Sequence, residues 1–174
     1  MCDAQEMLAS NLIESLKQIH QYIVVGLGTS VSALALSLAD SQRNVTEARL
    51  TPPGMFVVVD PKTALVLLLA ICVLVGAMAS YSAEAANAIA VELRSCSPDL
   101  LDAVRTFPSF ATSPYPGVRY AAALLPLFFS IATTVAVAVR HAPREWTWFW
   151  LGLIFLGAAY VPLALELHKS VGAP

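Results

Sequence analysis

Charged residues are scarce in this chain: Asp, Glu, Lys and Arg together make up 13% of its 174 residues. A soluble domain carries about 25% charged residues, so this chain has too few to cover a water-soluble surface. Hydrophobic residues reach 57% and the mean hydropathy is +0.69, values typical of a multi-span membrane protein. The formal net charge of −2 excludes binding to duplex nucleic acid through bulk electrostatic attraction.

Residues that form disulfides or bind metals are also few. The cysteines are Cys2, Cys72 and Cys96, an odd number without a CxxC pair, which argues against a disulfide framework and a zinc site. The histidines are His20, His141 and His168, each near the end of an apolar segment and without a second ligand at metal-binding spacing. We therefore expect reduced cysteines, no bound metal and no cofactor.

Motifs for catalysis and phosphate binding are missing too. The chain has no Ser-His-Asp arrangement, no HExxH motif and no paired carboxylates within an apolar segment, so we predict no catalytic residues and no enzyme activity. The stretch YIVVGLGTSVSALALSLAD begins like a phosphate-binding loop, but Gly26 and Gly28 are followed by Val31 where a dinucleotide fingerprint has its third glycine. We interpret these glycines as part of a membrane-spanning helix, where glycine is common.

Long apolar runs are what the chain does have. Crossing the hydrocarbon core of a bilayer takes roughly 20 apolar residues in a helix. Four segments approach that length, and they cover residues 21–39, 63–81, 120–139 and 146–165. Pro126 and Pro162 fall inside the last two, and Trp146 begins a tryptophan cluster suited to the membrane interface. The sequence therefore predicts an all-α membrane protein with four transmembrane helices.

Further helices are expected outside these spans. Residues 1–20 place apolar side chains at helical spacing, which predicts an amphipathic helix that lies on the membrane or packs against a neighbouring subunit. The apolar positions are Leu8, Leu12, Leu16 and Ile19. The second helix is expected to extend to about Arg94, since no helix breaker precedes Pro98. A short helix is then predicted from Ser97-Pro98 to about Arg105, and the run MFVVVD, residues 55–60, predicts a small strand.

The predicted domain organisation follows from these segments. Residues 1–20 form the amphipathic N-terminal helix, and residues 21–167 form the four-span membrane domain, including a helical and Pro-rich connection over 82–118. Residues 168–174 form a short tail. Lys and Arg are divided five against five between the two sides, so the positive-inside rule does not orient the chain. Because no signal peptide is recognisable, we expect cytoplasmic termini, as in a bacterial inner-membrane protein.

Small and polar residues form stripes along the first two helices. On the first helix the stripe is Gly26, Ser30, Ala33 and Ser37, with Asp40 at its end and with Ile23, Leu27, Val31, Leu34 and Leu38 on the opposite side. On the second helix the stripe is Gly76, Ser80, Ala83 and Asn87, with Glu84 beside it. One interpretation is that the stripes line a water-filled pore between subunits, with acidic rings at its mouths. The other is that small residues let neighbouring helices pack closely.

These patterns favour a homo-oligomeric channel or pore-forming effector, because one copy has too few polar residues to enclose a conduit. Cations on the side of the termini are candidates for binding a small anionic or nucleotide ligand that opens it: Lys17, Arg94, Arg105 and Arg119. The build is similar to that of nucleotide-gated effectors of bacterial defence, a similarity of architecture without a shared motif. The alternatives are an accessory or assembly subunit of a larger membrane complex and a small transporter. The expected partners are the lipid bilayer and further copies of the chain.

Overall fold

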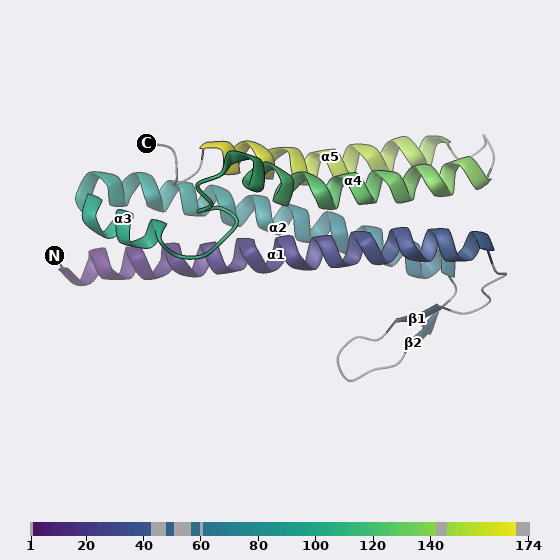
Figure 1. The fold of residues 1–174 in the computed structure, drawn as a ribbon, viewed down its shortest axis with the longest axis horizontal. Helices are drawn as coiled ribbons and strands as arrows, with labels where there is room; N and C mark the ends of the chain where they lie inside the picture. Colours follow the sequence, from purple (N-terminus) through teal and green to yellow (C-terminus); the bar gives the residue numbers. More distant parts are fainter. Residues whose placement is uncertain (1, 43–47, 51–56, 60, 142–145, 170–174) are drawn as a thin grey trace.

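The computed structural model describes the backbone of residues 2–42, 48–50, 57–59, 61–141 and 146–169. Side chains are described for residues 4–38, 63–137, 150 and 152–168. The elements, in chain order, are α1 Cys2–Gln42, β1 Ala48–Leu50, β2 Val57–Val59, α2 Pro61–Cys96, α3 Pro98–Arg105, α4 Pro116–His141 and α5 Trp146–Lys169 (Figure 1).

Four long helices, α1, α2, α4 and α5, lie side by side along one axis (Figure 1). Helix α1 packs against α2 and α4, while α5 packs against α2 and α4. Helices α4 and α5 continue through Pro126 and Pro162 respectively. The two glycines of the first apolar segment, Gly26 and Gly28, lie within α1. The prediction of a helix there is confirmed, and a phosphate-binding loop is excluded.

Three of these helices are long and apolar enough to cross a membrane, which makes the chain a multi-pass membrane protein. The stretches are Ala4–Leu38 in α1, Thr63–Cys96 in α2 and Pro116–Val137 in α4. The described apolar part of α5, Gly152–His168, is shorter than these three. The predicted transmembrane character is therefore confirmed for the first three spans.

The four long helices differ in length. Helices α1 and α2 have 41 and 36 residues, whereas α4 and α5 have 26 and 24. At 1.5 Å per residue, α1 reaches about 61 Å and α4 about 39 Å. The excess of α1 and α2 lies at the end of the bundle where α1 begins and α5 ends, and α3 packs there (Figure 1). We call this part, residues 4–20 and 88–115, the termini-side layer.

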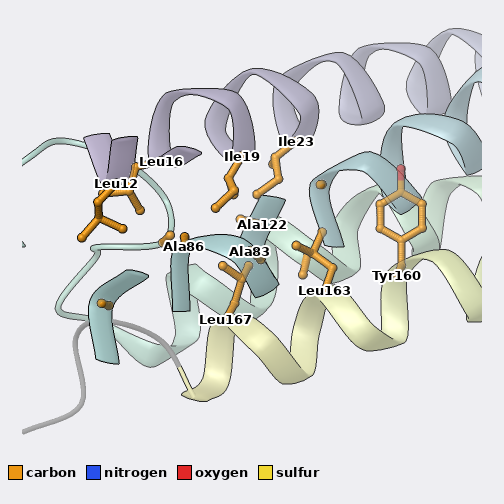
Figure 2. Packing of buried hydrophobic residues seen from close by; sticks show 14 of the residues in the cluster. Leu12, Leu16, Ile19, Ile23, Ala83, Ala86, Ala122, Tyr160, Leu163 and Leu167 are labelled. Atoms are coloured by element: carbon orange, nitrogen blue, oxygen red, sulfur yellow. The ribbon is translucent and has the colours of Figure 1, made fainter. Parts of the chain in front are cut away.

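The amphipathic start of the chain packs inside this layer. The apolar side chains of Leu12, Leu16 and Ile19 are buried in one cluster with Leu93 of α2 and Leu101 of α3. Figure 2 shows the α1 members of this cluster facing the other helices of the same chain. The stripe is thus covered within one chain, in place of the two sequence-based alternatives, a membrane surface and a neighbouring subunit. The predicted boundary between the N-terminal helix and the first span, at residue 20, is not a break in the backbone, because α1 continues through it.

The two smaller predicted elements are present. Helix α3 has Ser97 as its N-cap residue, Pro98 in its first turn and Arg105 as its last residue, as the sequence predicts. The predicted strand in residues 55–60 appears as β2, which pairs antiparallel with β1 in the register Ala48↔Val59. This hairpin lies at the end of the bundle opposite the termini-side layer (Figure 1).

Candidate functional site

The predicted pore stripe of α1 faces the interior of a single chain. Gly26, Ser30, Ala33 and Ser37 are all buried. The hydroxyl of Ser30 donates to the carbonyl of Leu27 at 2.9 Å, and that of Ser37 donates to the carbonyl of Leu34 at 2.8 Å. Such local bonds satisfy a hydroxyl without water. Burial of the stripe is what the close-packing interpretation expects. Lining of a pore by the stripe stays a prediction, and it requires the bundle to open.

The stripe of α2 contacts α5 through two polar bridges. The hydroxyl of Ser80 donates to the carbonyl of Ala159 at 2.6 Å. The amide of Asn87 donates to the carbonyl of Glu166 at 3.0 Å and to its Oε2 atom at 2.9 Å. These bonds replace water as partners of polar groups between helices, so they join α2 to α5 along the stripe.

The residues predicted beside the two stripes, or opposite the α1 stripe, differ in their exposure. Glu84 is exposed on the outer side of α2, and the side chain of Asp40 lies outside the described residues. On α1, Val31 and Leu38 are exposed, as expected for the side opposite the stripe. Ile23, which was assigned to that opposite side, is buried with the stripe. That assignment is wrong, because at 100° per residue Ile23 falls close to Ser30 on the helix surface.

A buried polar cluster at the centre of the bundle was missed by the sequence analysis. The sulfur of Cys72 lies 3.2 Å from the hydroxyl of Tyr160 and 3.1 Å from that of Ser130. Tyr160 also donates to the carbonyl of Cys72 at 3.0 Å, and its hydroxyl lies against Gly26. The cluster therefore ties all four long helices together. A tyrosine in the middle of an apolar segment, away from the interfacial belt, was the available signal.

A second polar level marks the border between the bundle and the termini-side layer. Each long helix contributes polar side chains there, and they are His20, Asn87, Arg119, Tyr120, Glu166 and His168. Tyr120 and His168 share a hydrogen bond between Oη and Nδ1, and their rings stack with centroids 5.6 Å apart. Polar and aromatic groups at one depth on every helix are typical of a membrane–water interface.

The four candidate ligand-binding cations are not gathered in one place. Lys17 is exposed on α1, and its Nζ atom lies 3.8 Å from Oε2 of Glu14. Arg94 is exposed near the end of α2. Arg119 is buried in the first turns of α4. Of the four, Arg105 alone lines the cavity described next. Within the described ranges, no group of three or more His, Cys, Asp or Glu side chains is arranged to hold a metal ion.

A cavity of about 540 Å³ lies where the segment after α3 folds over α1. It is lined by His20, Arg105, Thr106, Phe107, Pro108, Ser109, Phe110, Thr112, Ser113, Pro114 and Val118. The imidazole of His20 stacks on the ring of Phe110, with centroids 4.7 Å apart. The cavity therefore sits at the polar border level, between α1, the end of α3 and the start of α4.

Part of the outward surface of α1 is made of small and polar residues, which lie between the exposed side chains of Val24, Val25, Val31 and Leu38. Gln21, Gly28, Ser32 and Ala35 are exposed and fall within one narrow sector of the helix. Ser32 is two residues from Ser30 and faces outward, whereas Ser30 faces inward. We call Gln21, Gly28, Ser32 and Ala35 the outer α1 face.

No protein-family model, curated protein or solved structure matches this chain.

Proposed function

We propose that the protein is a homo-oligomeric channel or pore-forming effector of a bacterial inner membrane, with four spans and cytoplasmic termini. In this proposal, copies meet through the outer α1 face, and an anionic ligand bound at the termini-side layer opens the pore. The observation that carries the proposal is the composition of that face.

The contrast with the other helices supports this role for the outer α1 face. The exposed faces of α2, α4 and α5 carry large apolar side chains suited to lipid, and examples are Leu67, Ile71, Leu74, Leu125, Phe128, Ile154 and Phe155. The outer α1 face has Gly28, Ser32 and Ala35 at the same depth, with exposed valines and a leucine on either side of it. Small residues let membrane helices approach closely, and a hydroxyl is tolerated facing water or another helix. Contact with another copy, with a wet path beside it, accounts for this composition.

A fourth span supports the proposed topology. Helix α5 has 24 residues, and at 1.5 Å per residue it reaches about 36 Å, enough to cross about 30 Å of hydrocarbon. It lies beside α4 along the bundle, so it occupies the same depth as an established span (Figure 1). Four spans place both termini on one side of the membrane.

The accessory or assembly subunit is the second candidate, and burial of the two predicted pore stripes favours it. Ser30 and Ser37 bond to their own helix, and Ser80 and Asn87 bond to α5, so no described conduit crosses a single chain. In this alternative, the outer α1 face docks a different membrane protein in place of a second copy.

Particle mass and ion flux distinguish the two candidates. We expect the detergent-purified protein to form a discrete homo-oligomer and to conduct ions in liposomes. Ser32→Leu and Gly28→Leu should dissociate the particle and abolish flux, since a large side chain separates helices that meet at small residues. Ala77→Leu is the matched control, because Ala77 is an exposed small residue on the lipid-facing side of α2. A monomeric wild-type particle without flux would exclude the channel and leave the accessory subunit.

A further inference from the structure

We propose that the cavity at the border of the termini-side layer, between Arg105 and His20, is a binding site for a phosphate group. This inference rests on the ligand-opened pore proposed above, and it names the site and the chemistry of the ligand. The site joins three elements, because His20 belongs to α1, Arg105 to α3 and Val118 to α4.

The charges around the cavity favour an anion. Arg105 supplies a permanent positive charge, His20 supplies an imidazole, and none of the described lining residues is acidic. The nearest carboxylate on the same helix is that of Asp102, which accepts a hydrogen bond from Arg105 Nη1 at 2.8 Å. A guanidinium has five N–H donors in a planar fork, and this fork matches phosphate oxygens. Because the fork has several donors, bonding to Asp102 does not by itself exclude an oxyanion from the same group.

Neutral hydrogen-bond donors lie beside these charges. Within the described part of the chain, Nδ1 of His20 is buried and makes no hydrogen bond. The hydroxyl of Ser109 accepts from the backbone N–H of Ala111, and that of Ser113 accepts from the backbone N–H of Tyr115. A hydroxyl that accepts in this way keeps its own proton to donate. The two hydroxyls are donors of the kind that an oxyanion takes up, and Nδ1 of His20 is one as well in the tautomer that carries its proton there.

The remaining walls are apolar, which narrows the class of ligand. The apolar lining residues are Phe107, Pro108, Phe110, Pro114 and Val118. A volume of about 540 Å³ exceeds the space that a bare phosphate ion fills and lies in the range of small-molecule sites. The chemistry fits a phosphate that carries an apolar part. Two sources share it: the headgroup of an anionic phospholipid and a soluble phosphate.

The test uses the full chain, purified in detergent, and two probes. One probe is inorganic phosphate, titrated against the protein by calorimetry. The other is phosphatidylglycerol, measured by native mass spectrometry as lipid retained by the protein and as lipid exchanged from vesicles of phosphatidylglycerol in phosphatidylcholine. The variants are Arg105→Gln and His20→Gln. The control is Arg94→Gln, which removes the same charge from an exposed position outside the cavity.

We expect wild-type protein and Arg94→Gln to bind, and Arg105→Gln to bind about tenfold or more weakly, as for loss of a charge-assisted hydrogen bond. Binding of inorganic phosphate identifies a soluble source, whereas selective retention of phosphatidylglycerol identifies a headgroup. Hydrogen exchange of residues 106–115 in wild-type protein, which should slow with the bound probe, tests the site even if a variant fails to fold. Absence of binding with both probes, or equal loss in Arg94→Gln, would overturn the proposal.

The outcome is separable from that of the proposed pore. A stable oligomer with ion flux but without phosphate binding would contradict the proposed site and support the proposed channel. A monomer that binds phosphate through Arg105 would support the proposed site and contradict the proposed channel.

Discussion

The ring of Tyr160 on α5 lies directly on Gly76 of α2. A Cβ atom added at Gly76 would come within 2.7 Å of Tyr160 Cε2, closer than van der Waals contact allows. Helices α2 and α5 can approach to this distance because position 76 has no side chain. The same ring extends to α1, where a Cβ added at Gly26 would come within 2.8 Å of its hydroxyl.

Gly76→Ala should therefore destabilise the bundle, by about 1–3 kcal/mol, the usual cost of overpacking a well-packed core. Reaction of the buried Cys72 thiol during heating in detergent measures this, in a background where Cys2→Ser and Cys96→Ser remove the other thiols. Gly157→Ala is the control, since an added Cβ there meets nothing within 4 Å. Equal melting of the two alanine variants would contradict the described contact.

Tyr160→Phe should lower the free energy of unfolding by about 1 kcal/mol. The change keeps the ring and removes the hydroxyl that bonds to the carbonyl of Cys72 and lies beside its sulfur. Tyr81→Phe is the matched control, because Tyr81 is exposed on the outer side of α2. The same thermal assay reports both variants, and an unchanged melting curve for Tyr160→Phe would argue against the buried cluster.

Substitution by leucine should have different effects at Ser30 and at Ser32. Ser30 is fully buried, so Ser30→Leu should overpack the bundle and cost about 1–3 kcal/mol. Ser32 is exposed, so Ser32→Leu should leave the unfolding of an isolated chain unchanged and alter the particle mass. Thermal unfolding and size measured on the same samples separate these effects. Flux lost without a change in stability in Ser30→Leu would instead support a wet inner stripe.

Leu16→Ala should loosen the termini-side layer by about 2–5 kcal/mol, the typical cost of deleting a buried leucine side chain. Leu16 is fully buried between α1 and the rest of the layer, whereas Met7 on the same helix is exposed. Hydrogen exchange of residues 98–105 should therefore speed up in Leu16→Ala and stay unchanged in Met7→Ala. Equal protection of α3 in both variants would contradict the layer's packing.

The sequence predicts the long helices well, because the length and hydropathy of a segment indicate whether it forms a helix surrounded by lipid. The continuation of α2 to Cys96 follows from the absence of a breaker before Pro98, and α3 follows from the Ser97-Pro98 start. The predicted N-terminal helix runs into the predicted first span, and the two form one continuous helix, α1.

The sequence does not predict which side of each helix faces a neighbour. On α1, inward and outward faces both carry small and hydroxylated residues, so Ser30 and Ser32 are indistinguishable by type. Only packing decides between them, and packing depends on contacts distant in sequence, such as that between Gly26 and Tyr160. The cavity escaped prediction for a related reason: residues 106–115 are irregular, and their folding over His20 depends on tertiary contact.

Helix α1 has no proline between Cys2 and Gln42, and it is helical throughout that range. Because the helix is unbroken, a tilt about a pivot such as His20 moves both of its ends together. A tilt of about 5° about that pivot displaces an end roughly 20 residues away by about 3 Å, given a rise of 1.5 Å per residue. One continuous helix therefore connects the termini-side layer physically with the end of the bundle that carries the β1–β2 pair.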